Sequence, residues 1–444
     1  MPEGAALSSF SVESAVALPG PRWLRAARQA AAERFAASPL PTSELEEWRY
    51  SRIDALDLER YHLASLAPAS PAASTAPAGP AYAGRDLVRA LVGSVGRGVT
   101  LIETHDGQVA QAHGSDRSVS VERLSAPDAK HVELGDLAGE PDAFAILNRA
   151  FAPAPVRIRV AKGSTPDPIV VVHWADTDGA ALFPRLLFEV EEQAEVSVLE
   201  VVAGPGAVLV VPVTELDVAA AARLSYLHVQ LLGPQAWQIG LQASRVGRDA
   251  SVVSAAVSLG GDYARMRTDS ALVAPGGSGR LLALYFGSGT QMHDFRTIQH
   301  HQAPKTTSDL LYKGAVANSS RSVYSGLIRV EKGARGTNAF QTNRNLVLHE
   351  GAHADSVPNL EIEDNDVHCS HASAVGPIAE DQRFYLESRG VPPSVTDRLI
   401  ALGFLDDVLE QIPVAAVAPT LREALAEKLT EAEVAESVRR DIRP

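Results

Sequence analysis

The pattern of apolar and polar positions divides the chain into three parts. Close to the N-terminus, apolar residues recur at spacings of three or four and predict an amphipathic helix over residues 21–37. From about residue 156 to residue 376 the apolar runs are short and β-branched. Gly, Asp and Asn separate these runs, which is typical of strands joined by turns. Beyond residue 377 the helical spacing returns. The pattern therefore predicts a mainly β chain with a helical region at each end.

A loose internal repeat marks the β region. Four times, a small residue is followed by a polar residue and an apolar run, and the spacings are 28, 28 and 29 residues. The small residues are Ala194, Ala222, Ala250 and Gly279. Propeller blades need about 40 residues or more, so this shorter period favours stacked coils in which each strand pairs with its copy in the next coil. An ordinary β-sandwich with chance spacing is the alternative.

Five segments follow from these patterns. Residues 1–64 form an N-terminal helical region, and residues 65–83, almost entirely Ala, Pro and Ser, form a linker that has too few large apolar residues to build a core. Residues 84–155 are a mixed α/β segment whose fold the pattern leaves open. Residues 156–376 form the β-solenoid core, and residues 377–444 form a C-terminal helical domain.

The C-terminal helical domain carries an apolar stripe at spacings of three or four residues. Its positions are Val395, Leu399, Leu402, Leu405 and Leu409. Such a stripe either packs against the chain's own core or binds a partner helix, and the spacing alone fits both.

Composition narrows the classes of function. The formal net charge is −14, which makes a general nucleic-acid binder or an anionic-membrane binder a poor interpretation. The single cysteine, Cys369, excludes a disulfide within the chain and fits a reducing compartment. We find neither a secretory signal pattern nor an apolar run of 18 residues, so we expect a cytoplasmic protein that binds neither nucleic acid nor membrane.

Histidines supply the main candidate chemistry. Seven of the thirteen lie between residues 293 and 371, and two of them flank Cys369. Residues two apart in a strand share a face, so Cys369 and His371 should point the same way and His368 the opposite way. Imidazole and thiolate suit iron, zinc and copper, but two ligands make only a partial metal site that a partner chain could complete. A small buried core cysteine is the alternative.

Other catalytic signatures are weak. The chain has no GxSxG, HExxH or Walker A motif. Four aspartates could form paired carboxylates, as in β-helix enzymes that process polysaccharides, although nothing in the sequence brings two of them together. They are Asp217, Asp249, Asp262 and Asp269. A polysaccharide-processing enzyme and a metal-storage protein therefore stay open as alternatives.

Seven stretches of the chain resemble the signatures of the SufB/SufD family. The most specific is DVHCSHA at residues 366–372. The others are EWRYS at 47–51, HHQAPKTTSDLLYKG at 300–314, YSGLI at 324–328, QTNRNLVL at 341–348, PNLEI at 358–362 and EDQRFYLESRG at 380–390. SufB-like chains carry a cysteine in the stretch corresponding to residues 340–348, where this chain has none. The chain is therefore similar to the SufD branch, although Ala372 replaces that branch's usual glycine.

The resemblance implies a right-handed parallel β-helix flanked by helical regions. It also implies a non-enzymatic scaffold subunit of the SUF iron–sulfur cluster assembly machinery. Such a subunit pairs with a SufB-type subunit and docks a SufC-type ATPase through its C-terminal helices. Because two solenoids can pair through the same surface, we expect a homodimer when the chain is isolated. We expect no tightly bound cofactor in the chain alone and a cluster held transiently with the SufB-type partner. The resemblance makes Cys369 and His371 candidate shared ligands, and the stripe from Val395 to Leu409 a candidate ATPase-docking helix.

Overall fold

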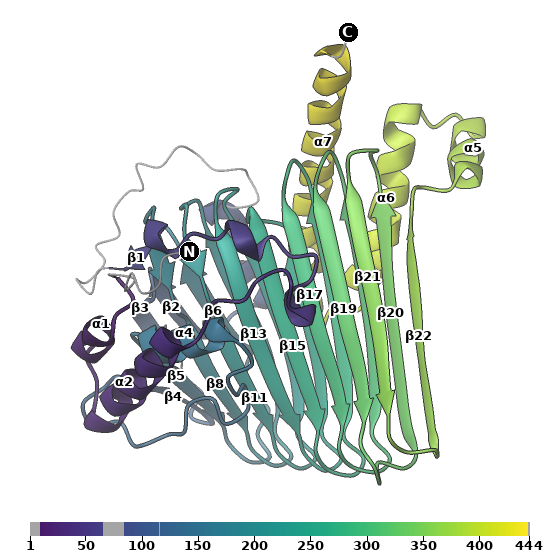
Figure 1. Cartoon of the computed structure of the whole chain (residues 1–444). Coiled ribbons are helices and arrows are strands. Elements are labelled where there is room, and N and C mark those ends of the chain that lie inside the picture. Colours follow the sequence, from purple (N-terminus) through teal and green to yellow (C-terminus); the bar gives the residue numbers. More distant parts are fainter. Residues whose placement is uncertain (1–8, 65–83, 115, 443–444) are drawn as a thin grey trace.

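The computed structural model describes residues 9–64, 84–114 and 116–442, so the predicted linker at residues 65–83 lies outside the described residues. Two long sheets face each other along the molecule (Figure 1). Sheet I contains, from one end to the other, β4 (Val119–Arg123), β5 (Val156–Val160), β8 (Arg185–Val190), β11 (Val213–Val218), β13 (Trp237–Val246), β15 (Tyr263–Leu272), β17 (Met292–His301), β19 (Arg321–Val330) and β21 (His353–Ile362).

Along the chain, the strands of sheet II alternate with those of sheet I. It contains β3 (Gln108–His113), β2 (Thr100–His105), β6 (Ile169–Trp174), β9 (Glu195–Gly204), β12 (Arg223–Leu232), β14 (Ser251–Ser258), β16 (Ser278–Gly287), β18 (Thr307–Val316), β20 (Thr337–Val347) and β22 (Val367–Gly376). Three short strands, β1 (His62–Leu63), β7 (Ala180–Leu182) and β10 (Leu209–Val210), extend sheet I at one side. From β5 onward, each strand of a sheet pairs in parallel with its copy in the next coil, so the predicted β-solenoid is confirmed.

The strand register corrects one of the predicted repeats. Glu195, Arg223, Ser251 and Ser278 are successive register partners, so the residue that corresponds to Ala250 is Gly277 and not Gly279. A shift of two residues leaves the alternation of inward and outward side chains unchanged, which is why the pattern did not reveal it. In each coil the residue before the small one has a positive φ, and this bend starts the strand. These bend residues are Gln193, Ala221, Asp249 and Gly276.

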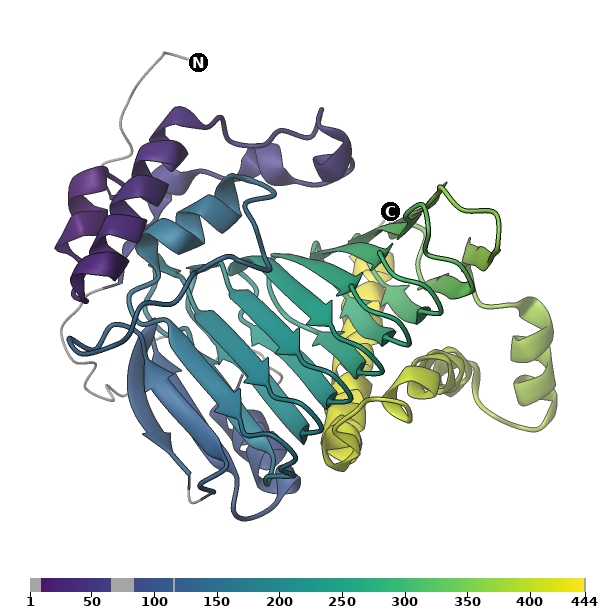
Figure 2. The same cartoon turned by 90° about the horizontal axis from the view of Figure 1, so that it is seen from below.

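Helices cover both outer faces of the solenoid (Figure 2). They are α1 (Val12–Ala17), α2 (Arg22–Ala37), α3 (Arg85–Val95), α4 (Ala143–Phe151), α5 (Glu380–Ser388), α6 (Pro393–Leu409) and α7 (Ala418–Ile442), with short 3-10 turns at Glu46–Trp48, Ile53–Ala55, Leu58–Arg60 and Ala415–Val417. Apolar residues of α3, α6 and α7 pack on sheet II, whereas α4 and the N-terminal segment pack on sheet I. None of the helices in the described part of the chain is long and apolar enough to cross a membrane.

The segment at residues 84–155 closes the N-terminal end of the solenoid. Strand β3 pairs antiparallel with β2 at the edge of sheet II, and β4 pairs antiparallel with β5 at the edge of sheet I. Helix α4 follows, and the side chain of Asp142 caps it by accepting hydrogen bonds from the backbone N–H groups of Phe144 and Ala145 at 3.0 Å. The first coil therefore lies under further structure of the same chain.

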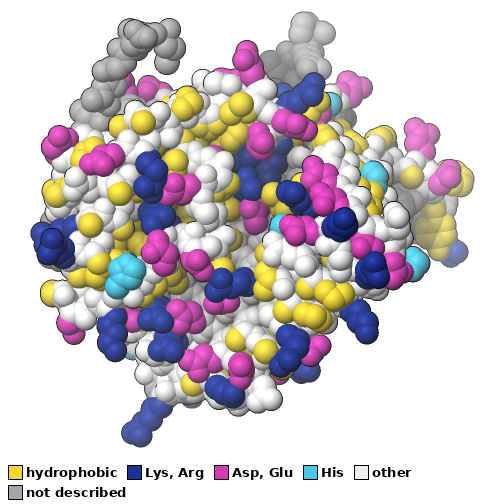
Figure 3. All heavy atoms as spheres, turned by 60° about the horizontal axis from the view of Figure 1, so that its bottom comes forward, with side chains coloured by type: hydrophobic (Ala, Val, Ile, Leu, Met, Phe, Trp, Pro, Cys, Tyr) yellow, Lys and Arg dark blue, Asp and Glu magenta, His cyan; other side chains and the backbone are white. Residues whose placement is uncertain are grey.

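The outer face of sheet I carries a ladder of ion pairs. Arg157 pairs with Glu189 at 2.8 Å, and Arg245 pairs with Asp217 at 2.7 Å on strands nearer the centre. On the face drawn in Figure 3, basic and acidic side chains are interspersed. Such partly exposed pairs contribute little to stability individually, but they keep opposite charges side by side across neighbouring strands.

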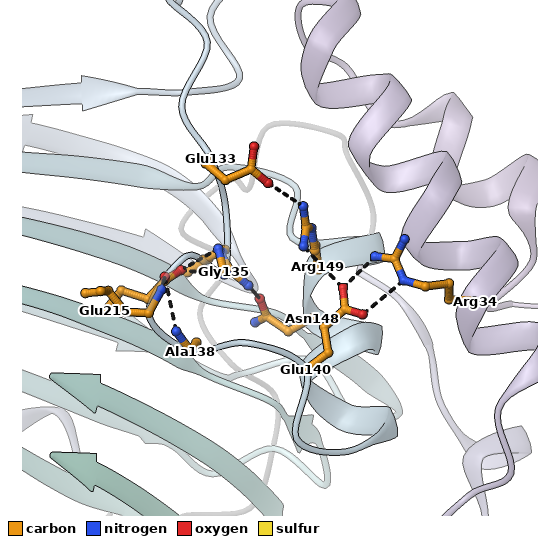
Figure 4. A network of polar contacts seen from close by, with 10 residues as sticks. Arg34, Glu133, Gly135, Ala138, Glu140, Asn148, Arg149 and Glu215 are labelled. Carbon is orange, nitrogen blue, oxygen red and sulfur yellow. Dashed lines mark hydrogen bonds and ion pairs between the residues drawn. The ribbon is translucent and has the colours of Figure 1, made fainter. Parts of the chain in front are cut away.

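A polar network that runs from the surface into the interior ties the N-terminal elements to sheet I (Figure 4). Glu140, just before α4, accepts hydrogen bonds from Arg34 of α2 and from Arg149 of α4. Deeper in the network, the carboxylate of Glu215 on β11 pairs with Arg185 on β8 at 2.5 Å, and both side chains are buried. This network fixes the loop before α4 against the sheet.

The solenoid interior encloses hydrogen-bonding groups as well as apolar side chains. Even the first coils, which enclose many Val, Leu and Ile side chains, contain a buried polar cluster. Glu200 lies between His173 and His228, with an oxygen 3.2 Å from a nitrogen of each ring. Burial acts to raise the pKa of Glu200, but these imidazole contacts outweigh it and hold the pKa below its usual range.

Two further histidines in the interior should make the folding stability of the chain sensitive to acid. Burial lowers the pKa of His293 to about 3 and that of His301 to about 4. The unfolded chain binds protons at these residues below about pH 6.5, but the folded chain does not, so stability falls as the pH falls. At pH 5 each histidine should cost about 2 kcal/mol of unfolding free energy. Urea unfolding at pH 7.5 and pH 5.0 measures this loss of unfolding free energy. In His293→Gln the difference between the two pH values should be smaller than in the parent chain. The control, His353→Gln at an exposed histidine, should leave it unchanged, and equal pH dependence in all three proteins would contradict the prediction.

Candidate functional site

The C-terminal end of the solenoid is open. Within the described residues, β21 pairs only with β19, and β22 pairs only with β20. The inner faces of these last strands carry exposed apolar residues: Leu360, Ile362 and Val375 are 36, 43 and 44% exposed. Ile328 and Val330, the register partners of Leu360 and Ile362 in the preceding coil, are fully buried. Core-type positions are therefore exposed only because the described chain supplies no further coil, and the edges of both strands offer unpaired backbone groups.

Cys369 and His371 lie on the inner face of this last coil. They are the register partners on β22 of Ala339 and Gln341, both of which are buried in the interior. The Cys369 side chain is half-buried against Ala339 and its neighbours, whereas the His371 side chain is exposed. His368 is exposed on the outer face. Cys369 and His371 thus share a face at the rim of the open end.

The Cys369 thiol is not activated by its surroundings. Burial raises its pKa, and a backbone hydrogen bond at Ala339 offsets only part of this effect. The side chain is therefore a protonated thiol at neutral pH, and a soft metal ion that bound there would have to displace the proton. The described residues contain no group of three or more His, Cys, Asp or Glu side chains arranged to hold a metal ion. Cys369 and His371 are at most part of a site.

The other histidines of the sequence cluster do not converge on Cys369. His293 and His301 lie inside the solenoid, and His300 pairs with Glu331 at 2.7 Å on the outer face of sheet I. His353 pairs with Asp355 at 3.1 Å, and His349 accepts a hydrogen bond from the backbone N–H of Asn318 at 2.8 Å. Their proximity in sequence reflects successive strands of the solenoid.

The predicted docking stripe of α6 is divided between the core and the surface. Leu405 and Leu409 are buried in the cluster between α6 and sheet II, so they are not available to a partner. Val395 and Leu402 are partly buried, and Leu399 is exposed. Sequence spacing places all five residues on one stripe, but it does not show how far sheet II extends beneath the helix.

A groove between α5 and α6 offers a different apolar surface. Its cavity measures about 730 Å³, and its apolar lining includes Leu346, Tyr385, Leu386, Leu399 and Phe404. None of the residues of α5 is buried, and Phe384 beside the groove is 75% exposed. Two hydrogen bonds from Arg383 to Asp397, at 2.6 and 2.8 Å, hold α5 against α6. In Figure 1, α5 projects from the solenoid beside the end of α6.

The four aspartates considered for polysaccharide chemistry have structural roles. Asp217 pairs with Arg245, Asp262 with Arg52 at 2.8 Å, and Asp269 with Arg267 at 2.9 Å. Asp249 occupies a positive-φ bend of the solenoid. These aspartates are neutralised or placed at turns, which does not favour paired acid–base catalysis.

Comparison with known proteins agrees with this architecture. The sequence model of the family described as "SUF system FeS cluster assembly, SufBD core domain" matches residues 173–404, more than half of the chain. An iron–sulfur cluster assembly SufBD family protein of Mycobacterium tuberculosis is 34% identical over 271 residues, which cover 59% of this chain and 68% of the relative.

Two relatives named SufD also match. The iron–sulfur cluster assembly protein SufD of Escherichia coli is 28% identical over 84% of this chain and 85% of its own length. SufD of Bacillus subtilis is 28% identical over 63% of this chain and 64% of its own length. The predicted resemblance is thus confirmed. The chain belongs to the SufBD family of the SUF iron–sulfur cluster assembly system, and it is similar to SufD proteins over most of its length.

Proposed function

We propose that this chain is a non-enzymatic scaffold subunit that joins a SufB-type subunit through the open end of its solenoid. The observation that carries the proposal is the exposure of core-type residues on the last coil. A partner of the same architecture can continue both sheets, because its edge strands supply the missing hydrogen bonds and its inner residues cover Leu360, Ile362 and Val375. In the isolated chain a second copy can cover the same surface, which gives a homodimer.

The cargo is an iron–sulfur cluster or its iron and sulfide components. Cys369 and His371 supply a thiol and an imidazole at the rim that the partner covers, and these are ligand types that iron accepts. The partner would contribute the remaining ligands, since the described residues of this chain offer no complete set. The cluster is then held only while both subunits are joined.

A SufC-type ATPase is the proposed partner of the groove between α5 and α6. Tyr385 and Leu399 present exposed apolar side chains there, and Phe384, next to Tyr385 on α5, is also exposed. This assignment moves the docking surface from the buried positions Leu405 and Leu409 to the α5 side of α6. ATP hydrolysis on that partner would act on the solenoid pair through α5 and α6.

Co-purification of the tagged chain with its SufB- and SufC-type subunits tests both surfaces. Val375→Glu places a charge in the proposed solenoid interface, so it should reduce recovery of the SufB-type subunit at least tenfold and leave the ATPase bound. Phe384→Glu combined with Leu399→Glu should have the reverse effect. The matched control is Val16→Glu on α1, a valine 40% exposed against 44% for Val375, which should change neither. Undiminished SufB-type recovery with Val375→Glu would contradict the proposed pairing.

A further inference from the structure

Beneath His371 lies a buried amide that the described chain leaves without a hydrogen bond. Gln341 is 2% exposed, and neither its side-chain oxygen nor its nitrogen has a hydrogen-bond partner among the described residues. An unpaired buried amide costs about 1–3 kcal/mol relative to a paired one. A residue that served packing alone would be expected to be apolar at this position, so the amide indicates a role beyond packing.

The surroundings of Gln341 restrict where that partner can be. The side chain points inward from β20 and reaches the opposite sheet, because a Cβ on Gly326 of β19 would lie 2.3 Å from its Nε2. In the preceding coil its register partner is Leu310, which is apolar, and in the following coil its register partner is His371. The hydroxyl of Tyr324, also near Gly326, already pairs with Thr297 at 3.0 Å. His371 is therefore the polar neighbour on the open side.

We propose that Gln341 is a positioning residue for the cargo site, and that its amide oxygen accepts a hydrogen bond from the ring N–H of His371. This inference rests on the proposed function of His371. A histidine that binds a metal through one nitrogen commonly donates its other N–H to a fixed acceptor, which sets the tautomer and the direction of the ring. An amide oxygen suits this role, since it stays an acceptor at every physiological pH.

The two residues of the proposed arrangement differ in their exposure to solvent. His371 is exposed at the rim, where a partner subunit can reach it, whereas Gln341 is sealed below it within this chain. Gly326 is required opposite, because any side chain there would occupy the space of the Gln341 amide. The hydrogen bond would hold the imidazole with its second nitrogen directed at the open end.

Gln341→Met tests the proposal because it keeps the length of the side chain and removes its acceptor. In urea unfolding the midpoint should change little, since the variant loses one hydrogen bond to an exposed histidine but also removes a buried amide nitrogen that has no partner among the described residues. The matched control is Gln242→Met, also in the interior, where the amide exchanges hydrogen bonds of 2.8 and 3.0 Å with Ser254. That variant should lower the urea midpoint and leave the His371 site unaffected.

Two readouts at the site itself distinguish positioning from packing. Nitrogen NMR of the histidine-labelled full chain, with the His371 signal identified by its loss in His371→Ala, should show one ring tautomer in the parent and a mixture in Gln341→Met. Gln341→Glu, which retains an acceptor, should restore the single tautomer. In the complex with the SufB- and SufC-type subunits, Gln341→Met should weaken binding of ferrous iron about tenfold or more.

The outcomes separate this inference from the function on which it rests. If His371→Ala leaves iron binding by the complex unchanged, the proposed cargo site itself is wrong. If His371→Ala abolishes iron binding but Gln341→Met changes neither the tautomer nor the affinity, the cargo site stands and the positioning role is wrong. A loss of folding stability in Gln341→Met equal to that in Gln242→Met would also contradict the inference.

Discussion

Replacing Glu215 with alanine is expected to lower the free energy of unfolding by about 3–5 kcal/mol, the typical cost of removing one partner of a buried ion pair. Its carboxylate pairs with Arg185 at 2.5 Å, and burial acts to lower the pKa of that guanidinium. The same carboxylate accepts hydrogen bonds from the backbone N–H groups of Gly135 at 2.9 Å and Leu137 at 3.0 Å (Figure 4). Alanine would leave a buried cation and these loop amides without their acceptor.

Urea unfolding followed by circular dichroism measures this loss. The control is Glu191→Ala, which breaks an exposed pair with Arg159 at 2.9 Å and should cost at most about 1 kcal/mol. Adding Arg185→Met to Glu215→Ala removes the stranded charge, so the double variant should be less destabilised than Glu215→Ala alone. Equal costs for Glu215→Ala and Glu191→Ala would show that the network does not hold the loop.

The fold was predictable because a solenoid repeats one structural unit. Each coil needs a bend and two strands with inward apolar residues, so the pattern recurs and the period can be read without knowing any contact. The same reasoning, that residues two apart share a face, placed Cys369 and His371 together and His368 apart. The strand register was harder to predict. Aligning Gly279 instead of Gly277 with Ala250 shifts the strand by two residues, which keeps every side chain on the same face.

The environment of the candidate site was less predictable, because exposure depends on which coil is the last one. Val375 and Asn345 are register partners with the same inward orientation, yet one is exposed and the other is buried. Leu405 and Leu399 likewise share a helix, but only the former lies over sheet II. Gln341 was part of a recognised signature, and its unpaired amide emerges only when all of its neighbours are placed.

Gly314→Ala is expected to destabilise the chain by about 3 kcal/mol or more, the upper part of the range for overpacking a core. Gly314 belongs to a stretch that resembles the family signature, and its register partner in the neighbouring coil is Tyr285. A Cβ on Gly314 would lie 1.9 Å from Cε2 of that ring, far inside van der Waals contact. The glycine is thus required because the tyrosine ring lies flat against its backbone.

The tyrosine ring has no room to yield. Tyr285 is fully buried, its hydroxyl donates to Asn345 Oδ1 at 2.7 Å, and it accepts a hydrogen bond from Asn343 Nδ2 at 3.1 Å. On its other side the ring centroid lies 4.7 Å from that of Phe295. A shift of the ring that accommodated a methyl group would therefore break both hydrogen bonds or displace the phenylalanine, so the clash has to be absorbed by the backbone of β18.

A double-mutant cycle assigns the cost to this single contact. Tyr285→Ala removes the ring and should itself cost about 3–5 kcal/mol, but adding Gly314→Ala to it should cost little more, because the space is then empty. Gly376→Ala on β22 is the control, since no atom lies within 4 Å of its Cβ position, and it should change the unfolding free energy by less than about 0.5 kcal/mol. If the costs of Gly314→Ala and Tyr285→Ala simply add, the glycine is required by something other than the ring. Coupling close to the full cost of Gly314→Ala would instead show that the signature glycine and the tyrosine of the preceding coil are one packing unit.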